Sequence, residues 1–127
     1  LLLVGGNTVR IDKPKLDARF IAGRAPNIQI YSKNKIFDKN IPLFSIPNRE
    51  VIISDNLLNM FNYKFVMIEG GYKLLDLLKE TFDYLVLLIS PKMRVGLNAK
   101  QIEMDFEIVH ENFIGQDKIV FLKKSNI

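Results

Sequence analysis

The segment Glu69-Gly70-Gly71 places a carboxylate and two glycines where a strand is expected to give way to a helix. Glycine lets an anion approach the main chain, and backbone N–H groups at the start of a helix attract negative charge. Lys73 would add a positive charge in the first turn of that helix. The segment is therefore a candidate phosphate site at the carboxyl end of a strand, the usual ligand edge of an open α/β sheet. A tight turn with an exposed glutamate is the alternative, and the G-x-G-x-x-G motif of dinucleotide-binding domains is not present here.

A second polar segment runs from Thr8 to Arg19 with the sequence TVRIDKPKLDAR. Its polar residues follow a strand end without a helical period, so composition alone predicts a charged loop. The region also holds a local excess of basic residues, which would suit a phosphorylated small molecule, with a solvated loop as the alternative. The basic residues are Arg10, Lys13, Lys15, Arg19 and Arg24, interrupted by Asp12 and Asp17.

Other reactive side chains indicate little chemistry. The single histidine, His110, lies in an alternating strand without a serine or metal-ligand partner at a recognisable spacing, so a Ser-His-Asp triad is not indicated. Glu103, Asp105 and Glu107 alternate at period two and are expected to be solvated strand residues rather than an acid/base pair. Because the chain has no cysteine, a thiol nucleophile, a disulfide and a thiolate zinc site are excluded, and we expect no bound metal.

Composition narrows the class of protein. The chain has 127 residues, of which 48% are hydrophobic and 25% charged, a balance typical of one globular domain. A net charge of +4 permits anionic partners, but no one-sided basic stripe with aromatic residues is visible, so nucleic acid is not an expected partner. The longest apolar run, Tyr84–Ile89, is far shorter than the roughly 20 residues that cross a membrane. Without a signal peptide, we expect a cytoplasmic protein with no membrane partner.

Strands and helices are expected to alternate around these segments. Strands are predicted at 1–4, 27–32, 43–46, 50–54 and 64–68. Residues 7–26 are predicted to be a long loop with at most one helical turn. Asp55 is predicted to cap a short helix through Phe61, and a longer helix is predicted after Gly71 with Leu74, Leu75 and Leu78 on one face.

The C-terminal part is expected to be dominated by strands. The unalternated apolar run within 83–90 predicts a central strand buried on both faces of its sheet. Two alternating segments, 102–113 and 118–123, predict a hairpin joined at Gly115-Gln116-Asp117. The whole order predicts an α/β fold with a mixed sheet and helices on both faces.

Three segments resemble motifs of one enzyme family, the reductase domain of the bifunctional riboflavin-biosynthesis deaminase/reductase. TVRIDKPKLDAR at 8–19 resembles its T-V-x-x-D-[DN]-P-x-L-T-x-R motif, and VMIEGGYKL at 66–74 resembles V-x-x-E-G-G-P-x-L. DYLVLLISPK at 83–92 is similar to the family's D-E-L-x-x-x-x-x-P-K segment, and Gly96 falls near its next glycine. The resemblance covers Leu1 to about Gly96, in order and spacing.

The resemblance implies a fold similar to dihydrofolate reductase: a mixed, mostly parallel sheet with helices on both faces and a C-terminal antiparallel hairpin. It implies NADPH-dependent reduction of the ribosyl group of 5-amino-6-(5-phosphoribosylamino)uracil to the ribityl form. It also implies a homodimer and a zinc deaminase domain that is fused upstream or paired with the reductase. The family's reductase domain opens with a K-x-A-x-S-x-D-G strand and a helix, so residues 1–127 are expected to be a reductase domain lacking both.

Site residues follow from the resemblance position by position. Those implied for the cofactor NADPH are Thr8, Asp12, Ser32, Gly71, Tyr72, Lys73 and Leu74. Those implied for the substrate are Leu16, Arg19 and Glu69. The guanidinium of Arg19 would bind the ribose phosphate, the hydroxyl of Ser32 the 2′-phosphate of the cofactor, and Glu69 would face the sugar. The catalytic acid or base stays unassigned.

Four positions depart from the family's motifs. Lys13 stands where the family often has Asp, Asp17 replaces the Thr, and Tyr72 and Lys73 replace the Pro and the residue after it. These departures support an alternative, a catalytically degenerate reductase-like domain that acts as a nucleotide-binding or dimerisation module. A third hypothesis, nucleic-acid binding, rests on the isoelectric point of about 9.3 alone.

Overall fold

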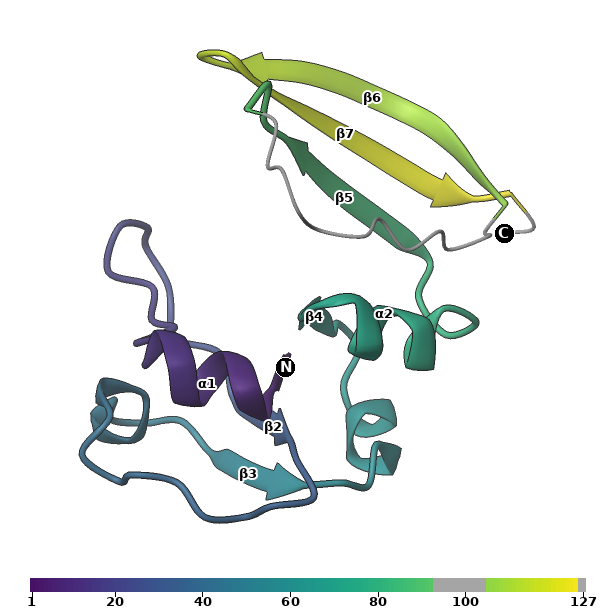
Figure 1. The fold of residues 1–127 in the computed structure, drawn as a ribbon. Coiled ribbons are helices and arrows are strands. Elements are labelled where there is room, and N and C mark those ends of the chain that lie inside the picture. The colour runs from purple at the N-terminus through teal and green to yellow at the C-terminus, as the bar shows by residue number, and fades with distance from the viewer. Residues whose placement is uncertain (93–104, 126–127) are drawn as a thin grey trace. The chain divides into compact units, whose positions relative to one another are not determined.

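The computed structural model describes residues 1–92 and 105–125 and divides into two compact units, Leu1–Leu74 and Leu75–Ile127. Strands and helices alternate in the first unit, and strands dominate the second (Figure 1). The expected mixed α/β fold with a parallel sheet and a C-terminal hairpin is confirmed. That residues 1–127 form one reductase domain without its first strand and helix stays a prediction, and Gly96 lies outside the described residues.

The first unit is built on a four-stranded parallel sheet in the order β3-β2-β1-β4. Its strands are β1 (Leu2–Gly5), β2 (Ile28–Tyr31), β3 (Val51–Ser54) and β4 (Met67–Glu69). Four of the five strands predicted for this region are therefore confirmed, with slightly different ends. Because all four run in the same direction, their carboxyl ends share one edge of the sheet.

The two central strands supply most of the core. Leu2 and Val4 of β1 and Ile28 and Ile30 of β2 are buried on one face, where helix α1 (Gly6–Asp12) adds Val9. Successive strand residues face opposite sides, so Leu3 and its register partner Gln29 lie on the other face. Gln29 is fully buried, and its amide donates to the carbonyl of Asn56 at 2.7 Å and accepts from the Asn59 side chain. Hydrogen bonds of this kind are what make a buried polar side chain tolerable.

The loop predicted at 7–26 is confirmed in part, because residues 13–26 contain neither helix nor strand. The segment begins with more helix than the single turn expected there: α1 has seven residues and ends where Lys13 adopts a left-handed conformation at φ 45°. The predicted strand at 43–46 is instead the 3₁₀ helix η1 (Pro42–Ser45), because Pro42 fixes a helical φ at its start. β-branched composition had suggested extended backbone there, but proline at the first helical position outweighs that preference.

The predicted cap at Asp55 was also wrong. The helix is η2 (Leu58–Asn62), which starts later than expected. The side chain of Asn56 forms the turn before it, because its Oδ1 accepts the backbone N–H of Leu58 at 2.8 Å. Asparagine closes such local turns as readily as aspartate.

The second unit contains an antiparallel sheet in the order β5-β7-β6. Its strands are β5 (Tyr84–Ile89), β6 (Phe106–Ile114) and β7 (Asp117–Lys124), and the helix α2 (Tyr72–Leu78) precedes them. The predicted hairpin is confirmed for its described part, with Gly115 at φ 64° in the turn. Residues 102–104 lie outside the described residues.

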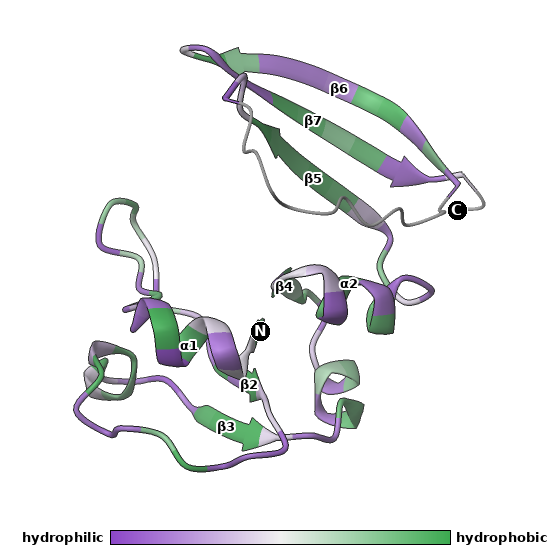
Figure 2. Cartoon of the chain, viewed as in Figure 1, coloured by the Kyte–Doolittle hydropathy of each residue, from purple (hydrophilic) through white to green (hydrophobic). Residues whose placement is uncertain are grey.

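The prediction that β5 is buried on both faces was wrong. Within the described residues, β5 pairs with β7 alone, and Tyr84 and Leu88 are 63% and 74% exposed. Figure 2 shows β5 as hydrophobic over nearly its whole length, whereas β6 mixes hydrophilic and hydrophobic residues. An apolar run in a sequence indicates that the strand favours burial, but it does not show which other element packs against that strand.

Candidate functional site

The parallel sheet has a topological switch point at its carboxyl edge. The chain adds β2 and β3 to one side of β1 and then returns to place β4 on the other side. Ligands of open α/β sheets bind where the connections diverge in this way. The register pairs Val4 with Glu69, so the segments leaving the two strands, Gly5-Gly6 and Glu69-Gly70-Gly71, lie next to each other. The structure thus brings the segment that leads into Thr8 and the Glu69-Gly70-Gly71 turn to the edge where a ligand is expected.

The turn after β4 is tightly packed at one glycine and open at the next. A Cβ on Gly70 would lie 2.7 Å from Cδ2 of Leu74, so only glycine lets α2 fold back this closely. A Cβ on Gly71 would meet nothing within 4 Å, which leaves room beside the main chain. Glu69 and Lys73 are exposed, Tyr72 is half-buried and Leu74 is buried. The exposed members of this group can face a ligand, whereas the side chain of Leu74 packs inside the turn.

Helix α1 carries two of the predicted cofactor residues on one face. Thr8 and Asp12 are four residues apart, a spacing that aligns side chains along a helix. Thr8 lies half-buried in the first turn, close to Gly5, and Asp12 is exposed at the last residue. The helix therefore starts at the carboxyl edge and presents Thr8 nearest to it.

Ser32 follows β2 directly and is 8% exposed. Its hydroxyl donates to the carbonyl of Asn34 at 2.6 Å and accepts from Nη2 of Arg10 at 3.1 Å. A Cβ on Gly6 would lie 2.7 Å from both Cβ and Oγ of Ser32, so the first residue of α1 lies directly against this side chain. Ser32 is thus at the predicted edge, with its hydroxyl already engaged.

Arg10 also lies at this edge, although the sequence identifies it only as one of five basic residues and gives it no individual role. Its guanidinium also donates to the carbonyls of Asn34 at 2.7 Å and Ile36 at 3.5 Å and to Oδ1 of Asn7 at 3.4 Å. It stacks over the ring of Phe37 at 4.1 Å. The basic run around it was visible in the sequence, but nothing in its spacing shows that α1 delivers this side chain to the end of β2.

The predicted substrate residues Leu16 and Arg19 lie in the loop after α1. Leu16 is half-buried, packs against the core cluster and adopts a positive φ of 51°. Nε of Arg19 lies 3.5 Å from Oδ1 of Asp17, and Nζ of Lys15 lies 3.3 Å from Oδ2 of the same carboxylate. In residues 1–92 and 105–125, no hydrogen bond or ion pair joins Arg19 to Glu69, so the structure does not bring these two predicted substrate residues into contact.

A second arginine that the sequence did not single out, Arg49, holds this loop in place. Its terminal nitrogens donate to the carbonyls of Lys15, Leu16 and Leu43. Its Nε is buried and has no hydrogen-bond partner among the described residues. Burial lowers the pKa of the Arg49 guanidinium, and the nearby carboxylate of Asp17 raises it back in part. Arg49 therefore fixes the main chain on which Leu16 and Asp17 stand.

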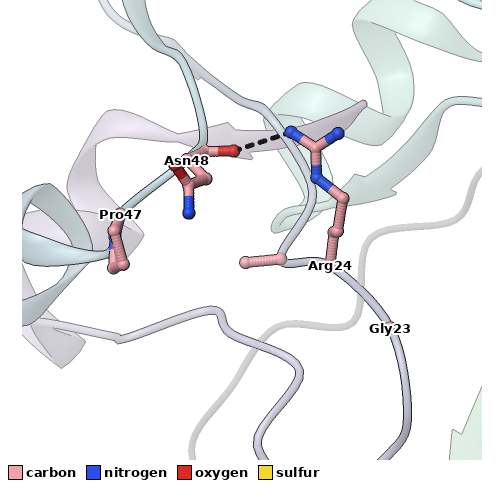
Figure 3. A pocket seen from close by; sticks show the side chains of 5 residues that line it. Gly23, Arg24, Pro47 and Asn48 are labelled. Atoms are coloured by element: carbon pink, nitrogen blue, oxygen red, sulfur yellow. Dashed lines mark hydrogen bonds between the residues drawn. The ribbon is translucent and has the colours of Figure 1, made fainter.

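One shallow cavity of about 520 Å³ lies away from this edge. It is lined by Gly23, Arg24, Ala25, Pro47 and Asn48, and Arg24 donates to the carbonyl of Asn48 at 3.0 Å (Figure 3). These residues precede β2 and β3, so the cavity opens at the amino ends of the strands. It is therefore distinct from the candidate site.

Residues 1–92 and 105–125 contain no group of three or more histidine, cysteine or carboxylate side chains that could hold a metal ion. Within the same ranges, no helix has the length and apolar character needed to cross a membrane.

Several solved structures share this fold. A diaminohydroxyphosphoribosylaminopyrimidine deaminase/5-amino-6-(5-phosphoribosylamino)uracil reductase from Thermotoga maritima matches with a TM-score of 0.78 and 22% identity, covering 97% of this chain and 44% of that one. Two crystal forms of Acinetobacter baumannii RibD match with TM-scores of 0.78 and 0.77 at 15% and 14% identity, covering 96% of this chain and 46% of theirs. No protein-family model and no curated protein matches the chain by sequence. The chain spans less than half the length of these deaminase/reductase structures and has the fold of the part that it covers, which confirms the resemblance at the level of the fold.

Proposed function

We propose that this chain is the reductase portion of a riboflavin-pathway enzyme, which uses NADPH to reduce the ribosyl group of 5-amino-6-(5-phosphoribosylamino)uracil to the ribityl form. The observation that supports this most is that β1, which leads into Thr8 and the motif at 8–19, and β4, which leads into Glu69-Gly70-Gly71, are paired strands that end at the switch point of the parallel sheet. The shared fold with deaminase/reductase structures supports the same reaction class.

The residues at this edge fit a phosphorylated nucleotide cofactor. The guanidinium of Arg10 has only neutral acceptors among the described residues, so its positive charge is available to an anion. The main chain at Gly71 has open space beside it, which a diphosphate needs for close approach. The residues proposed to hold NADPH are Thr8, Asp12, Ser32, Gly71, Tyr72, Lys73 and Leu74.

The substrate would be held mainly by charged groups. The exposed carboxylate of Glu69 can accept hydrogen bonds from ribose hydroxyls, and the guanidinium of Arg19 can bind a phosphate through two nitrogens. Leu16 would pack against the substrate from the loop that Arg49 holds. NADPH, when bound, supplies the hydride that reduces C1′ of the ribose; the chain's own contribution is to place the two molecules next to each other.

The wider assembly is part of the same proposal. A homodimer, a zinc deaminase domain upstream or in a partner chain, and a cytoplasmic location would accompany this activity. The deaminase partner is supported by the length of the similar structures, of which this chain covers 44–46%.

Turnover by the full-length protein tests the proposal directly. We expect NADPH oxidation that depends on the phosphoribosylaminopyrimidine. Glu69→Gln should lower kcat/KM for the pyrimidine by about 10- to 100-fold, the cost of a lost hydrogen bond to a charged group, with little change in NADPH affinity. Glu80→Gln is the matched control, because Glu80 is an exposed glutamate that pairs with Lys124 in the second unit. Failure of the wild-type protein to bind NADPH would overturn the proposal.

One observation favours the degenerate binding module as a second candidate. Asp17, which stands where the family has Thr, pairs with both Lys15 and Arg19 and so engages the guanidinium proposed for the substrate phosphate. That module would bind the nucleotide without turning over the pyrimidine. The same assay separates the two candidates, because substrate-dependent NADPH oxidation excludes the second.

A further inference from the structure

The carboxyl end of β2 holds an arginine whose charge no described carboxylate neutralises. Arg10 donates to a hydroxyl, an amide oxygen and two carbonyls, and all of these acceptors are neutral. No ion pair involves this residue in residues 1–92 and 105–125. An anion brought to this position would therefore meet a full positive charge in a partly buried site, where electrostatic attraction is stronger than in bulk water.

The hydroxyl of Ser32 is poorly suited to be the primary phosphate donor. Its single hydrogen is directed at the carbonyl of Asn34 at 2.6 Å, and one of its lone pairs receives Nη2 of Arg10. A hydroxyl has one donor only, so bonding a phosphate oxygen would require breaking the bond to Asn34. In its observed arrangement Ser32 fixes the position of Arg10, and Arg10 is the group that carries charge.

The loop that holds Arg10 is itself basic. Its carbonyl acceptors come from the segment 32–36, which includes Lys33 and Lys35 and no carboxylate. Both lysines are exposed, and the ring of Phe37 supports the guanidinium from the far end of the segment. Two lysines of this loop, together with Arg10 from α1, suit a phosphomonoester, which carries close to two negative charges at neutral pH.

We propose that Arg10, positioned by Ser32, binds a phosphomonoester at the end of β2 and thereby selects the 2′-phosphorylated nicotinamide nucleotide over its unphosphorylated counterpart. This inference rests on the proposed function for the identity of the nucleotide. Arg10 is the specificity-determining residue, and Ser32 is a positioning residue that acts through it. Lys33 and Lys35 add charge without fixed geometry.

Equilibrium titration of the full-length protein with NADPH and NADH tests this assignment. Arg10→Met should weaken NADPH binding by about 10- to 100-fold, the range expected for a charge-assisted hydrogen bond, and change NADH binding less than about twofold. Arg10→Lys should retain part of the preference, since it keeps the charge but loses the planar fork. Ser32→Ala should lower the NADPH preference only when Arg10 is present, a coupling that a merely structural serine would not show.

Arg24→Met is the matched control, because Arg24 is an exposed arginine at the opposite edge of the sheet and also donates to a carbonyl. It should leave both affinities unchanged. If Arg10→Met does not fold, the Arg10→Lys and Ser32→Ala measurements decide the question, and an unchanged NADPH-to-NADH ratio in both would overturn the assignment.

A second probe separates this inference from the proposed function. Adenosine 2′,5′-bisphosphate and adenosine 5′-phosphate differ by the 2′-phosphate and contain no nicotinamide. Arg10-dependent preference for the bisphosphate supports the phosphate site even if the protein reduces no pyrimidine. Equal binding of both probes, or a preference that Arg10→Met leaves intact, overturns the site whatever the outcome of the turnover assay.

Discussion

Two arginines each hydrogen-bond a segment that connects strands of the parallel sheet. Both are half-buried, but they lie at different places in the sheet. Arg49 donates to three carbonyls, its buried Nε has no hydrogen-bond partner among the described residues, and desolvation lowers its pKa. Arg10 reaches the carboxyl edge, stacks on Phe37 and binds the Ser32 hydroxyl. The first has its hydrogen-bonding capacity turned inward, whereas the second stands at the ligand edge of the sheet.

This difference in position indicates different roles: Arg49 stabilises the fold, and Arg10 is placed to bind a ligand. The terminal nitrogens of Arg49 donate to carbonyls of the loop after α1 and of η1, so this side chain is suited to hold the loop in place. Arg10 lies at the carboxyl edge of the sheet and has only neutral acceptors among the described residues, so its charge is available to an anion there. Substitutions at the two arginines should therefore affect different properties: stability for Arg49 and nucleotide preference for Arg10.

The largest effect on stability is expected at Arg49. Arg49→Met should lower the free energy of unfolding by about 3 kcal/mol, because three part-buried carbonyls, those of Lys15, Leu16 and Leu43, lose their donor together. Arg10→Met should cost about 1 kcal/mol or less, since the carbonyls of Asn34 and Ile36 belong to exposed residues that water can reach. Urea denaturation of the full-length protein measures both.

The comparison would fail if Arg10→Met proved as destabilising as Arg49→Met. In that case Arg10 would be a second structural clamp. Arg49→Lys provides the internal control: it keeps a charge but can reach only part of the three carbonyls, so its stability should lie between those of the wild type and Arg49→Met.

A smaller loss of stability is expected from Gly6→Ala, which affects the surroundings of Arg10 but not those of Arg49. The added Cβ would lie 2.7 Å from Cβ of Ser32 and 3.0 Å from Nη1 of Arg10, so the serine must shift. Overpacking of this kind costs about 1 to 3 kcal/mol, and displacement of Arg10 should also reduce the preference for NADPH. Thermal unfolding and the two nucleotide titrations report the two consequences separately.

Gly6→Ala combined with Ser32→Gly is the compensating variant. Removing Cβ and Oγ of Ser32 opens the space that the new methyl needs, so stability should recover while the NADPH preference stays low. Full recovery of both would mean that Ser32 does not position Arg10.

The strands of the parallel sheet were predictable because short apolar or alternating segments end at turn-forming residues. Ile28 and Ile30 alternate around Gln29, a pattern that predicts the strand although it does not predict that Gln29 is itself fully buried. The strand after Lys64 ends at two glycines. The sequence could not show the switch point, because the order β3-β2-β1-β4 depends on pairing between segments more than 60 residues apart. The proximity of Gly5-Gly6 to Glu69 is a property of the sheet order alone.

The two arginines were missed for a related reason. Arg10 and Arg49 sit in segments whose charge is ordinary for loops. All three partners of Arg49 and two of the four partners of Arg10 are main-chain carbonyls, which every residue possesses. Because any residue can supply a carbonyl acceptor, the sequence does not show which residues accept such hydrogen bonds. Motif resemblance, in turn, pointed to Ser32 and Arg19 but not to the contacts that already engage their side chains.

The smallest expected effect concerns Asp17, which links the Arg49-held loop to the proposed substrate residue. Asp17→Asn removes the carboxylate that pairs with Arg19 and Lys15. Because Arg19 is exposed and such pairs are worth about 0.2 to 1 kcal/mol, its release should lower KM for the phosphorylated pyrimidine by roughly two- to fivefold, with kcat unchanged. The NADPH-to-NADH preference should not move, since Asp17 makes no contact with Arg10. Asp76→Asn, which breaks the exposed pair with Lys79, is the matched control. A rise in KM would show that Asp17 orients Arg19 for the phosphate instead of competing with it, and the Arg49-held loop would then be a preorganised part of the substrate site.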